Sequence, residues 1–355
     1  VPVTDESPAT RCGAFYIRLP ENFCRETGMK QQAGIGIILA LTTAMCWGAL
    51  PIAMKQVLEV MAPPTVVFYR FLMASIGLGA ILAIKGKLPP MRIFRKPRWL
   101  VLLAIATGGL FGNFILFSSS LQYLSPTASQ VIGQLSPVGM MVASVVILKE
   151  RMRGTQVVGA LMLLSGLVMF FNTSLIEIFT RLTDYTWGVI FGVAAATVWV
   201  SYGVAQKVLL RRLASQQILF LLYTLCTIAL LPLAEPGVIS RLSSWQLACL
   251  IFCGLNTLVG YGALAEAMAR WQAAQVSALI TLTPLFTLLF SDLLSMAWPD
   301  VFARPMLNLI GYLGAFVVVA GAMYSAIGHR LWGRWRKREA VVPRPAQAND
   351  LRRVK

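Results

Sequence analysis

Two glutamines and a proline stand in a long apolar stretch of the chain, where groups capable of polar chemistry are scarce. Gln130 and Gln134 are four residues apart, so in a helix they share one face, one turn before Pro137. A buried amide needs hydrogen-bonding partners, and lipid offers none. We therefore expect both amides to face the interior of a helix bundle. They could join two helices or bind an amide, carboxylate or amine group of a substrate, and the depth of Gln134 favours binding there.

Pro137 and Pro284 each lie near the middle of an apolar stretch. Because proline has no backbone N–H, each leaves the carbonyl four residues earlier, at Gly133 or Ile280, without its helical donor. A free carbonyl at membrane depth is tolerated where the helix faces protein or a water-filled cavity. Two interpretations stay open: a kink that serves packing, or the wall of a cavity.

Arg70 is the only full charge well inside an apolar stretch in the first half of the chain. A charge at the centre of a membrane costs about 2.5–3.5 kcal/mol to insert. The side chain could reach up to the membrane surface, or it could bind an anionic group of a substrate. No carboxylate is predicted deep in a span, so the sequence indicates no proton relay. Facilitated diffusion, exchange and coupling through another site stay open.

Aromatic and amide side chains complete the candidate substrate site. Tryptophan and tyrosine usually mark membrane interfaces, but Trp47 and Trp199 lie well inside their apolar stretches. The two asparagines of the set stand among glycines, which let helices approach closely. The residues predicted to line a substrate cavity are Trp47, Arg70, Asn113, Gln130, Gln134, Pro137, Trp199, Tyr202, Asn256, Tyr261, Thr281 and Pro284.

The cysteines and the single histidine offer little chemistry. Cys249 and Cys253 share a helix face, but no histidine or further cysteine is near enough to complete a zinc site. His329 stands at the end of the last apolar stretch. We therefore predict no metal, no cofactor and no catalytic residues. A membrane-embedded enzyme would need a nucleophile with a base and is the least favoured class.

The composition indicates which kind of structural element holds these residues. Hydrophobic residues make up 57% of the 355-residue chain and charged residues 13%, against about 25% charged in soluble proteins. Residues 99–148 contain no Asp, Glu, Lys or Arg, and a membrane helix needs about 20 such residues. The chain is therefore predicted to be an all-α membrane protein. Ten transmembrane helices are expected at 32–54, 64–84, 99–122, 126–148, 155–176, 186–206, 214–234, 244–267, 272–291 and 306–328.

The two halves of the chain repeat each other. Aligning Trp47 with Trp199 places Gly36 on Gly188, and further along Pro137 falls on Pro284. In the same register Thr281 matches Gln134. Each half contains five of the predicted helices. Because five is an odd number, the second half would enter the membrane from the opposite side, as in the inverted repeats of secondary transporters.

Two five-helix repeats, with a tryptophan in the first and sixth helices and a mid-depth proline in the fourth and ninth, resemble the EamA family of the drug/metabolite transporter superfamily. The resemblance covers about residues 32–328. It implies a central cavity between helices one, three, four, six, eight and nine. It also implies export or exchange of a small metabolite, often an amino acid or a related compound, by alternating access. Where the family commonly has a Gly-Glu pair at the end of helix four, this chain has Lys149-Glu150, and Met296-Ala297 stands at the second copy.

The expected organisation follows from these observations. We expect a disordered or wrongly assigned extension at 1–28, five-helix repeats at 32–176 and 186–328, and a basic cytoplasmic tail at 329–355. The expected partners are a small-molecule substrate and the lipid bilayer, not nucleic acid. The oligomeric state stays open. A membrane scaffold that transports nothing is the alternative function, and it should be packed solid at the level of the two prolines.

The distribution of charge predicts that both termini are cytoplasmic. The net charge of +17 gathers in alternate loops and in the C-terminal segment, as expected for the cytoplasmic side of a bacterial inner membrane. An alkaline phosphatase fused after Lys355 should therefore be inactive. The same enzyme fused into the 235–243 loop, which is expected on the opposite side, should be active. High activity at Lys355 would contradict the topology.

Overall fold

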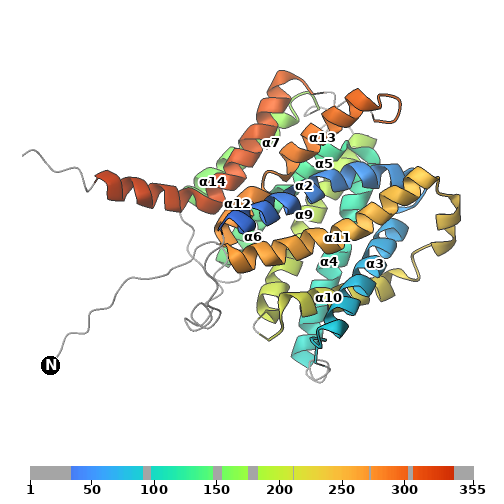
Figure 1. The fold of residues 1–355 in the computed structure, drawn as a ribbon. Helices are drawn as coiled ribbons and strands as arrows, with labels where there is room; N and C mark the ends of the chain where they lie inside the picture. The colour runs from blue at the N-terminus through green and yellow to red at the C-terminus, as the bar shows by residue number, and fades with distance from the viewer. Residues whose placement is uncertain are drawn as a thin grey trace, which may run out of the picture.

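The computed structural model describes residues 33–90, 97–146, 154–174, 183–210, 212–271, 273–302 and 307–339. Within these ranges the chain forms helices joined by turns and short connections, without a strand (Figure 1). Seven helical segments among the described residues are long and apolar enough to cross a membrane. The predicted all-α membrane class is confirmed, whereas the count of ten spans stays a prediction. The predicted extension at 1–28 and the Lys149-Glu150 pair lie outside the described residues.

The helices follow the apolar stretches closely. Those of the first half are α2 (Ala33–Leu58), α3 (Pro63–Ile84), α4 (Pro97–Tyr123), α5 (Pro126–Gly133), α6 (Leu135–Val146) and α7 (Gly154–Phe170). Those of the second half are α9 (Asp184–Leu209), α10 (Ser215–Leu230), the 3-10 helix η2 (Pro236–Arg241), α11 (Ser244–Arg270), α12 (Ala273–Ile280), α13 (Thr283–Ala297) and α14 (Leu309–Glu339).

Polar caps determine where some of these helices begin. Ser125 Oγ accepts a hydrogen bond from the backbone N–H of Ala128 at the start of α5, where Pro126 follows as a first-turn proline. Ser243 and Gln246 form a reciprocal capping box at the start of α11. These caps satisfy backbone donors of the first turn, which have no partner within the helix.

The continuous helices expected at 126–148 and 272–291 are each interrupted. α5 ends at Gly133 and α6 begins at Leu135, and α12 ends at Ile280 before α13 begins at Thr283. The cause is the missing N–H of the proline that follows each break. The sequence suggested that the carbonyl of Ile280 is free. In the structure Thr283 Oγ1 donates a hydrogen bond to it over 2.6 Å, so this carbonyl has a partner.

Two helices extend furthest beyond their expected ends. α13 continues to Ala297, so Asp292, expected in a loop, lies within the helix and is half-buried. α14 continues to Glu339 instead of ending at 328, and the first part of the predicted basic tail is therefore helical. No proline occurs between 329 and 339 to stop it.

The helices of one half pair with helices of the other (Figure 1). α2 packs along α11, and α9 packs along α4. α2 also contacts α12 and α13, just as α9 contacts α5 and α6. The α7–α14 pair lies at one end of the molecule and the α3–α10 pair at the other. The helices of the two halves correspond in order, from α2 with α9 to α7 with α14. Each of these contacts has a counterpart between the corresponding helices.

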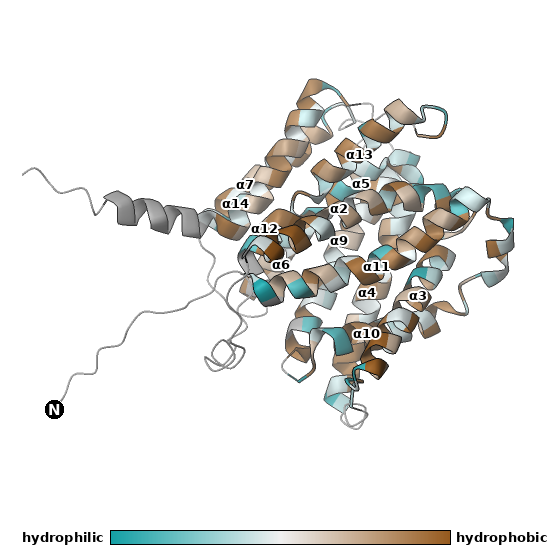
Figure 2. Ribbon diagram, viewed as in Figure 1, coloured by the Kyte–Doolittle hydropathy of each residue, from teal (hydrophilic) through white to brown (hydrophobic). Residues whose placement is uncertain are grey.

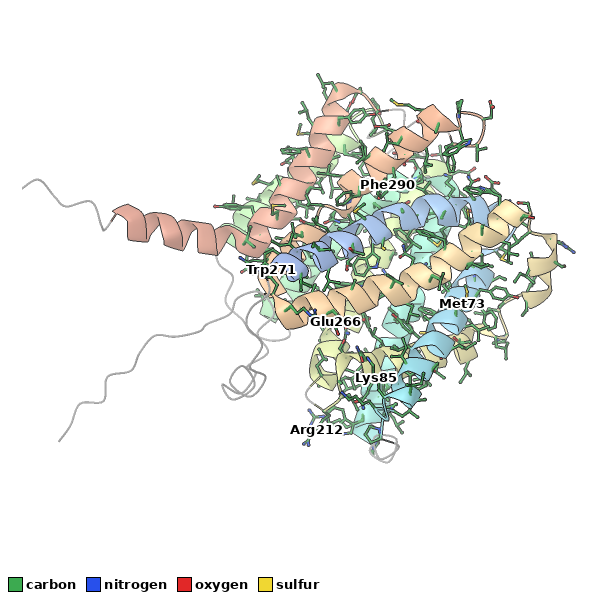
Figure 3. The ribbon with its side chains drawn as sticks, in the orientation of Figure 1. Met73, Lys85, Arg212, Glu266, Trp271 and Phe290 are labelled. Carbon is green, nitrogen blue, oxygen red and sulfur yellow. The ribbon has the colours of Figure 1, made fainter. Side chains whose placement is uncertain are left out.

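Two glycine contacts repeat this correspondence at the level of residues. A Cβ added to Gly36 of α2 would overlap the Cβ of Trp271, which follows α11 (Figure 3). A Cβ added to Gly188 of α9 would lie 2.7 Å from Cγ of Leu124, which follows α4. The glycines that align in the sequence thus allow the same close approach in both halves.

Large aliphatic side chains cover much of the outside of the helices. Ile38, Ile76 and Phe316 are among the exposed ones. Hydrophobic residues run along the helices, whereas many of the hydrophilic ones stand near helix ends and turns (Figure 2). A surface of this kind is stable in contact with lipid chains rather than with water.

The α7–α14 pair crosses at close-packed glycines. A Cβ on Gly166 would lie 2.6 Å from the backbone nitrogen of Val318, and one on Gly321 would lie 2.6 Å from that of Leu163. Both distances are shorter than van der Waals contact, so the two backbones approach because these side chains are absent. The same holds at Gly159 and Gly314.

We expect Gly166→Ala to lower the thermal stability of the protein purified in detergent, because overpacking costs about 1–3 kcal/mol. Gly108→Ala is the matched control, since a Cβ there meets nothing within 4 Å. Alanine is the better helix former, so the control should be as stable as the unmodified protein or more so. Equal losses in both variants would contradict a tight crossing.

Candidate functional site: a buried arginine and its aromatic surroundings

Arg70 reaches from α3 into the space between three other helices. Its side chain is 3% exposed. Nε and Nη2 each donate to Oγ1 of Thr257 in α11 over 3.3 Å, and Nη1 contacts Sδ of Met54 in α2 at 3.3 Å. The guanidinium carbon lies 4.6 Å from the centre of the Phe114 ring in α4. The interpretation in which Arg70 reaches the membrane surface is therefore wrong.

The charge of Arg70 has no acidic partner within the described part of the chain. Among those residues the ion pair is that of Glu266 with Arg270, at 2.9 Å and four residues apart on α11, as the spacing predicts. Thr257 cannot supply a counter-charge, because its hydroxyl is neutral and itself donates to the carbonyl of Cys253. The guanidinium is therefore held by neutral groups.

Five aromatic side chains, which we call the aromatic cluster, extend from Arg70 across the bundle. Successive ring centres are separated by 4.6 Å from Phe114 to Phe71, 5.7 Å from Phe71 to Tyr223, 6.3 Å from Tyr223 to Tyr261, and 5.1 Å from Tyr261 to Trp47. These are distances at which rings attract one another. The cluster joins α2, α3, α4, α10 and α11.

Tyr202 and Trp199 of α9 belong to the same apolar core as the aromatic cluster. Tyr202 is buried among the residues of this core, and its ring centre is 6.0 Å from that of Trp199. Of the four aromatic residues proposed for the site, Tyr261 and Trp47 thus belong to the aromatic cluster, and Tyr202 and Trp199 pack near it.

Tyr223, Phe114, Phe71 and Thr257 were not among the site residues predicted from the sequence. Tyr223 stands in the middle of α10, away from either end. That position argues against a role at the membrane interface, as it did for Trp47, and could have identified the residue. Phe114 and Thr257 carry no such signal, because phenylalanine and threonine are ordinary inside membrane helices.

The two asparagines join helices of the two halves. Asn113 Nδ2 in α4 donates to the carbonyl of Ala195 in α9 over 2.9 Å. Asn256 Nδ2 in α11 donates to the carbonyl of Cys46 in α2 over 2.5 Å. These bonds hold the equivalent pairs α4–α9 and α2–α11 through the two amide N–H groups, whereas the amide oxygen of Asn256 is buried without a partner among the described residues.

The two glutamines of α5 have different environments. Gln130 Nε2 donates to the carbonyl of Trp47 in α2 over 2.7 Å, which is the helix-joining role considered for it. Gln134 lies at the break after α5 and is partly exposed. Its side chain makes no hydrogen bond to the described residues. It is therefore the glutamine whose amide is open to other groups.

The second proline region is closed. Thr281 is 9% exposed and donates to the carbonyl of Ala278 over 2.7 Å. Pro284 is buried, whereas its counterpart Pro137 is exposed. Thr287 Oγ1, one turn further along α13, donates to the carbonyl of Gly48 in α2 over 2.9 Å. The two breaks thus match in sequence but differ in exposure.

The arrangement is suited to holding a ligand by charge and by aromatic contact. Among the described residues no group of three His, Cys, Asp or Glu side chains could hold a metal ion. What the site offers is one buried positive charge, several hydroxyls and a set of aromatic rings. These groups can bind an anion or an aromatic ring.

The difference between the two glutamines gives a paired prediction. Gln130→Leu should lower the thermal stability of the protein by about 0.6 kcal/mol, the mean value of a hydrogen bond between membrane helices. Gln134→Leu should leave stability unchanged, because no bond to the described residues is lost. Thermal unfolding in detergent measures both variants. A larger loss in Gln134→Leu than in Gln130→Leu would contradict these assignments.

Comparison with known proteins places the chain in a family. The sequence profile of the EamA-like transporter family matches residues 34–172 and again residues 186–325. The protein named "Uncharacterized inner membrane transporter YhbE" of Escherichia coli strain K12 is 88% identical over 317 residues, which are 89% of this chain and 99% of that protein. The "Aromatic amino acid exporter YddG" of Ancylobacter novellus is 27% identical over 175 residues, 48% of this chain and 57% of that protein.

The fold occurs in solved structures. One of them superimposes with a TM-score of 0.56 at 20% identity, over 83% of this chain and 98% of the other. The family profile matches twice, once over each of the two predicted repeats. The resemblance inferred from the paired tryptophans and prolines is confirmed, and the chain belongs to the EamA-like transporter family.

Proposed function

We propose that this transporter is a secondary carrier of the bacterial inner membrane that exports or exchanges a small metabolite by alternating access. In this proposal ten helices cross the membrane as two inverted five-helix repeats, and both termini are cytoplasmic. The observation that carries it is the exchange symmetry of the contacts. α2 with α11 and α9 with α4 are equivalent pairs, and each joins one half of the chain to the other.

Alternating access requires that the two repeats can exchange conformations, so that a central site opens to one side at a time. Equivalent residues should then differ in any one state. The exposed Pro137 and the buried Pro284 are such a pair. The partly exposed Gln134 and the buried Thr281 are another. These differences support a carrier in which the repeat around α5 and α6 is more open than the one around α12 and α13.

The proposed substrate is an amino acid or a related compound. The name of the Ancylobacter novellus relative, an aromatic amino acid exporter, supports this class, although that relative matches less than half of the chain. The aromatic cluster and Tyr202 provide apolar faces for a small metabolite. The proposal includes no coupling ion.

Metabolite profiling of cells that lack or overproduce the protein tests the function. At least one small metabolite should accumulate inside cells that lack the protein and should appear in the medium of cells that overproduce it. Overproduced Gln134→Leu should insert normally but release less of that metabolite, because a polar group open to the proposed cavity is lost. Gly108→Ala should release as much as the unmodified protein.

A scaffold protein would give a different outcome. If the metabolite profiles of cells with and without the protein are the same inside and outside, the carrier proposal is overturned. A metabolite profile that changes equally with the unmodified protein and with Gln134→Leu would support the carrier function and contradict a role of Gln134 in the substrate site.

A further inference from the structure

Two buried polar groups, one on α3 and one on α10, have unused hydrogen-bonding capacity. The hydroxyl of Tyr223 is buried and has no partner within the described part of the chain. The Arg70 guanidinium has five N–H donors, and its recorded contacts occupy one on each nitrogen, which leaves one on Nη1 and one on Nη2. Because native proteins satisfy about 90% or more of such groups, two of them joined through the same aromatic cluster indicate a site for a polar ligand.

Ring contacts link the two groups. The guanidinium carbon of Arg70 lies 4.6 Å from the centre of the Phe114 ring, and that ring centre lies 4.6 Å from the centre of the Phe71 ring. The ring of Tyr223 stacks on Phe71, the residue after Arg70, with 5.7 Å between ring centres. A ligand that accepts from Nη1 and Nη2 could therefore also accept from the hydroxyl of Tyr223.

Thr257 has a positioning role in this arrangement. Its Oγ1 accepts from Nε and Nη2 of Arg70 and donates to the carbonyl of Cys253 over 2.9 Å. All of its hydrogen-bonding capacity is therefore used. It orients the guanidinium plane and leaves the outer N–H groups of Arg70 to the ligand.

The positive charge of Arg70 indicates the charge of the ligand. Burying an ion without a partner costs several kcal/mol, and a membrane protein usually retains such a residue for a functional reason. One guanidinium balances one negative charge, and its planar fork matches the two oxygens of a carboxylate. A phosphate, with a charge of about −1.5 to −2 near neutral pH, would leave part of its charge uncompensated here.

We propose that Arg70 and Tyr223 bind the carboxylate of an aromatic monocarboxylate, whose ring packs against the aromatic cluster. This substrate class rests on the transport function proposed above. Arg70 is 3% exposed, so the site is closed in this state. Its walls come from α2, α3, α4, α10 and α11, which belong to both halves of the chain. The relative movement of the halves in alternating access would open it.

The test uses the full-length protein purified in detergent and three probes. 3-Phenylpropanoate carries the carboxylate and the ring, 3-phenylpropanamide has the same shape without the charge, and inorganic phosphate is an anion without the ring. Thermal unfolding is followed at increasing concentrations of each probe. A ligand that binds the folded state raises the unfolding temperature. We expect 3-phenylpropanoate to raise the unfolding temperature at concentrations at least about tenfold lower than those needed of 3-phenylpropanamide or phosphate. The amide lacks the charged hydrogen bond, and phosphate lacks the ring.

Three variants locate the binding. Arg70→Met should abolish the response to 3-phenylpropanoate while the unfolding temperature without probe stays the same or rises, because an apolar side chain replaces an unpaired buried charge. Tyr223→Phe removes only the hydroxyl and should weaken the response by about tenfold. Arg270→Met is the matched control, since it removes an arginine paired with Glu266 at the end of α11; its response should equal that of the unmodified protein.

Each result decides the proposal. Equal stabilisation by the acid and the amide, no stabilisation by either, or an unchanged response in Arg70→Met would overturn it. If Arg70→Met does not fold, Tyr223→Phe decides, and an unchanged response there overturns the proposal. Uptake of labelled 3-phenylpropanoate into vesicles containing the protein separates the proposed binding site from the proposed transport function. Binding that depends on Arg70 but is not followed by uptake would support the site and contradict transport of this probe. Metabolite export that persists in Arg70→Met would support the carrier function and contradict the site.

Discussion

A peptide group surrounded by hydrocarbon must find its hydrogen-bond partner inside the protein, and this constraint governs the whole molecule. It makes the described chain helical, and it limits where helices can be interrupted. The break between α5 and α6 is covered by α9, and the break between α12 and α13 is covered by α2. Both interruptions are thus covered by the first helix of the opposite half. The same constraint explains why Thr283 supplies a hydroxyl to the carbonyl of Ile280, whose helical donor is absent.

Features governed by rules local in the sequence were predictable. The apolar stretches gave the helical class, and the two prolines indicated where α5–α6 and α12–α13 depart from a regular helix. The spacing of Glu266 and Arg270 predicted their ion pair. The paired tryptophans and prolines were sufficient to identify the family, because a repeat compares the chain with itself. Element ends were less accurate, because α13 and α14 both continue past the expected positions. Pro299, two residues after α13, does mark the end of that helix in the sequence, whereas no proline interrupts residues 329–339 of α14.

The surroundings of Arg70 could not be predicted, because they come from segments far apart in the chain. Met54, Phe114 and Thr257 lie on three helices, and only packing brings them to one guanidinium. The roles of the two glutamines were likewise undecided in the sequence. Both lie on one helix face, yet only Gln130 reaches a carbonyl of α2. A spacing rule gives the direction of a side chain but not the neighbour that another helix places there.

The crossing of α7 and α14 has a consequence for how the protein is made. These are the last helices of the two halves, so α7 leaves the ribosome well before the segment that forms α14 exists. During that interval its glycines face lipid instead of a second backbone. Residues 34–172, although the family profile matches them as one unit, therefore lack the partner helix of α7 until synthesis is nearly finished. The room that these glycines leave is filled only when α14 is complete.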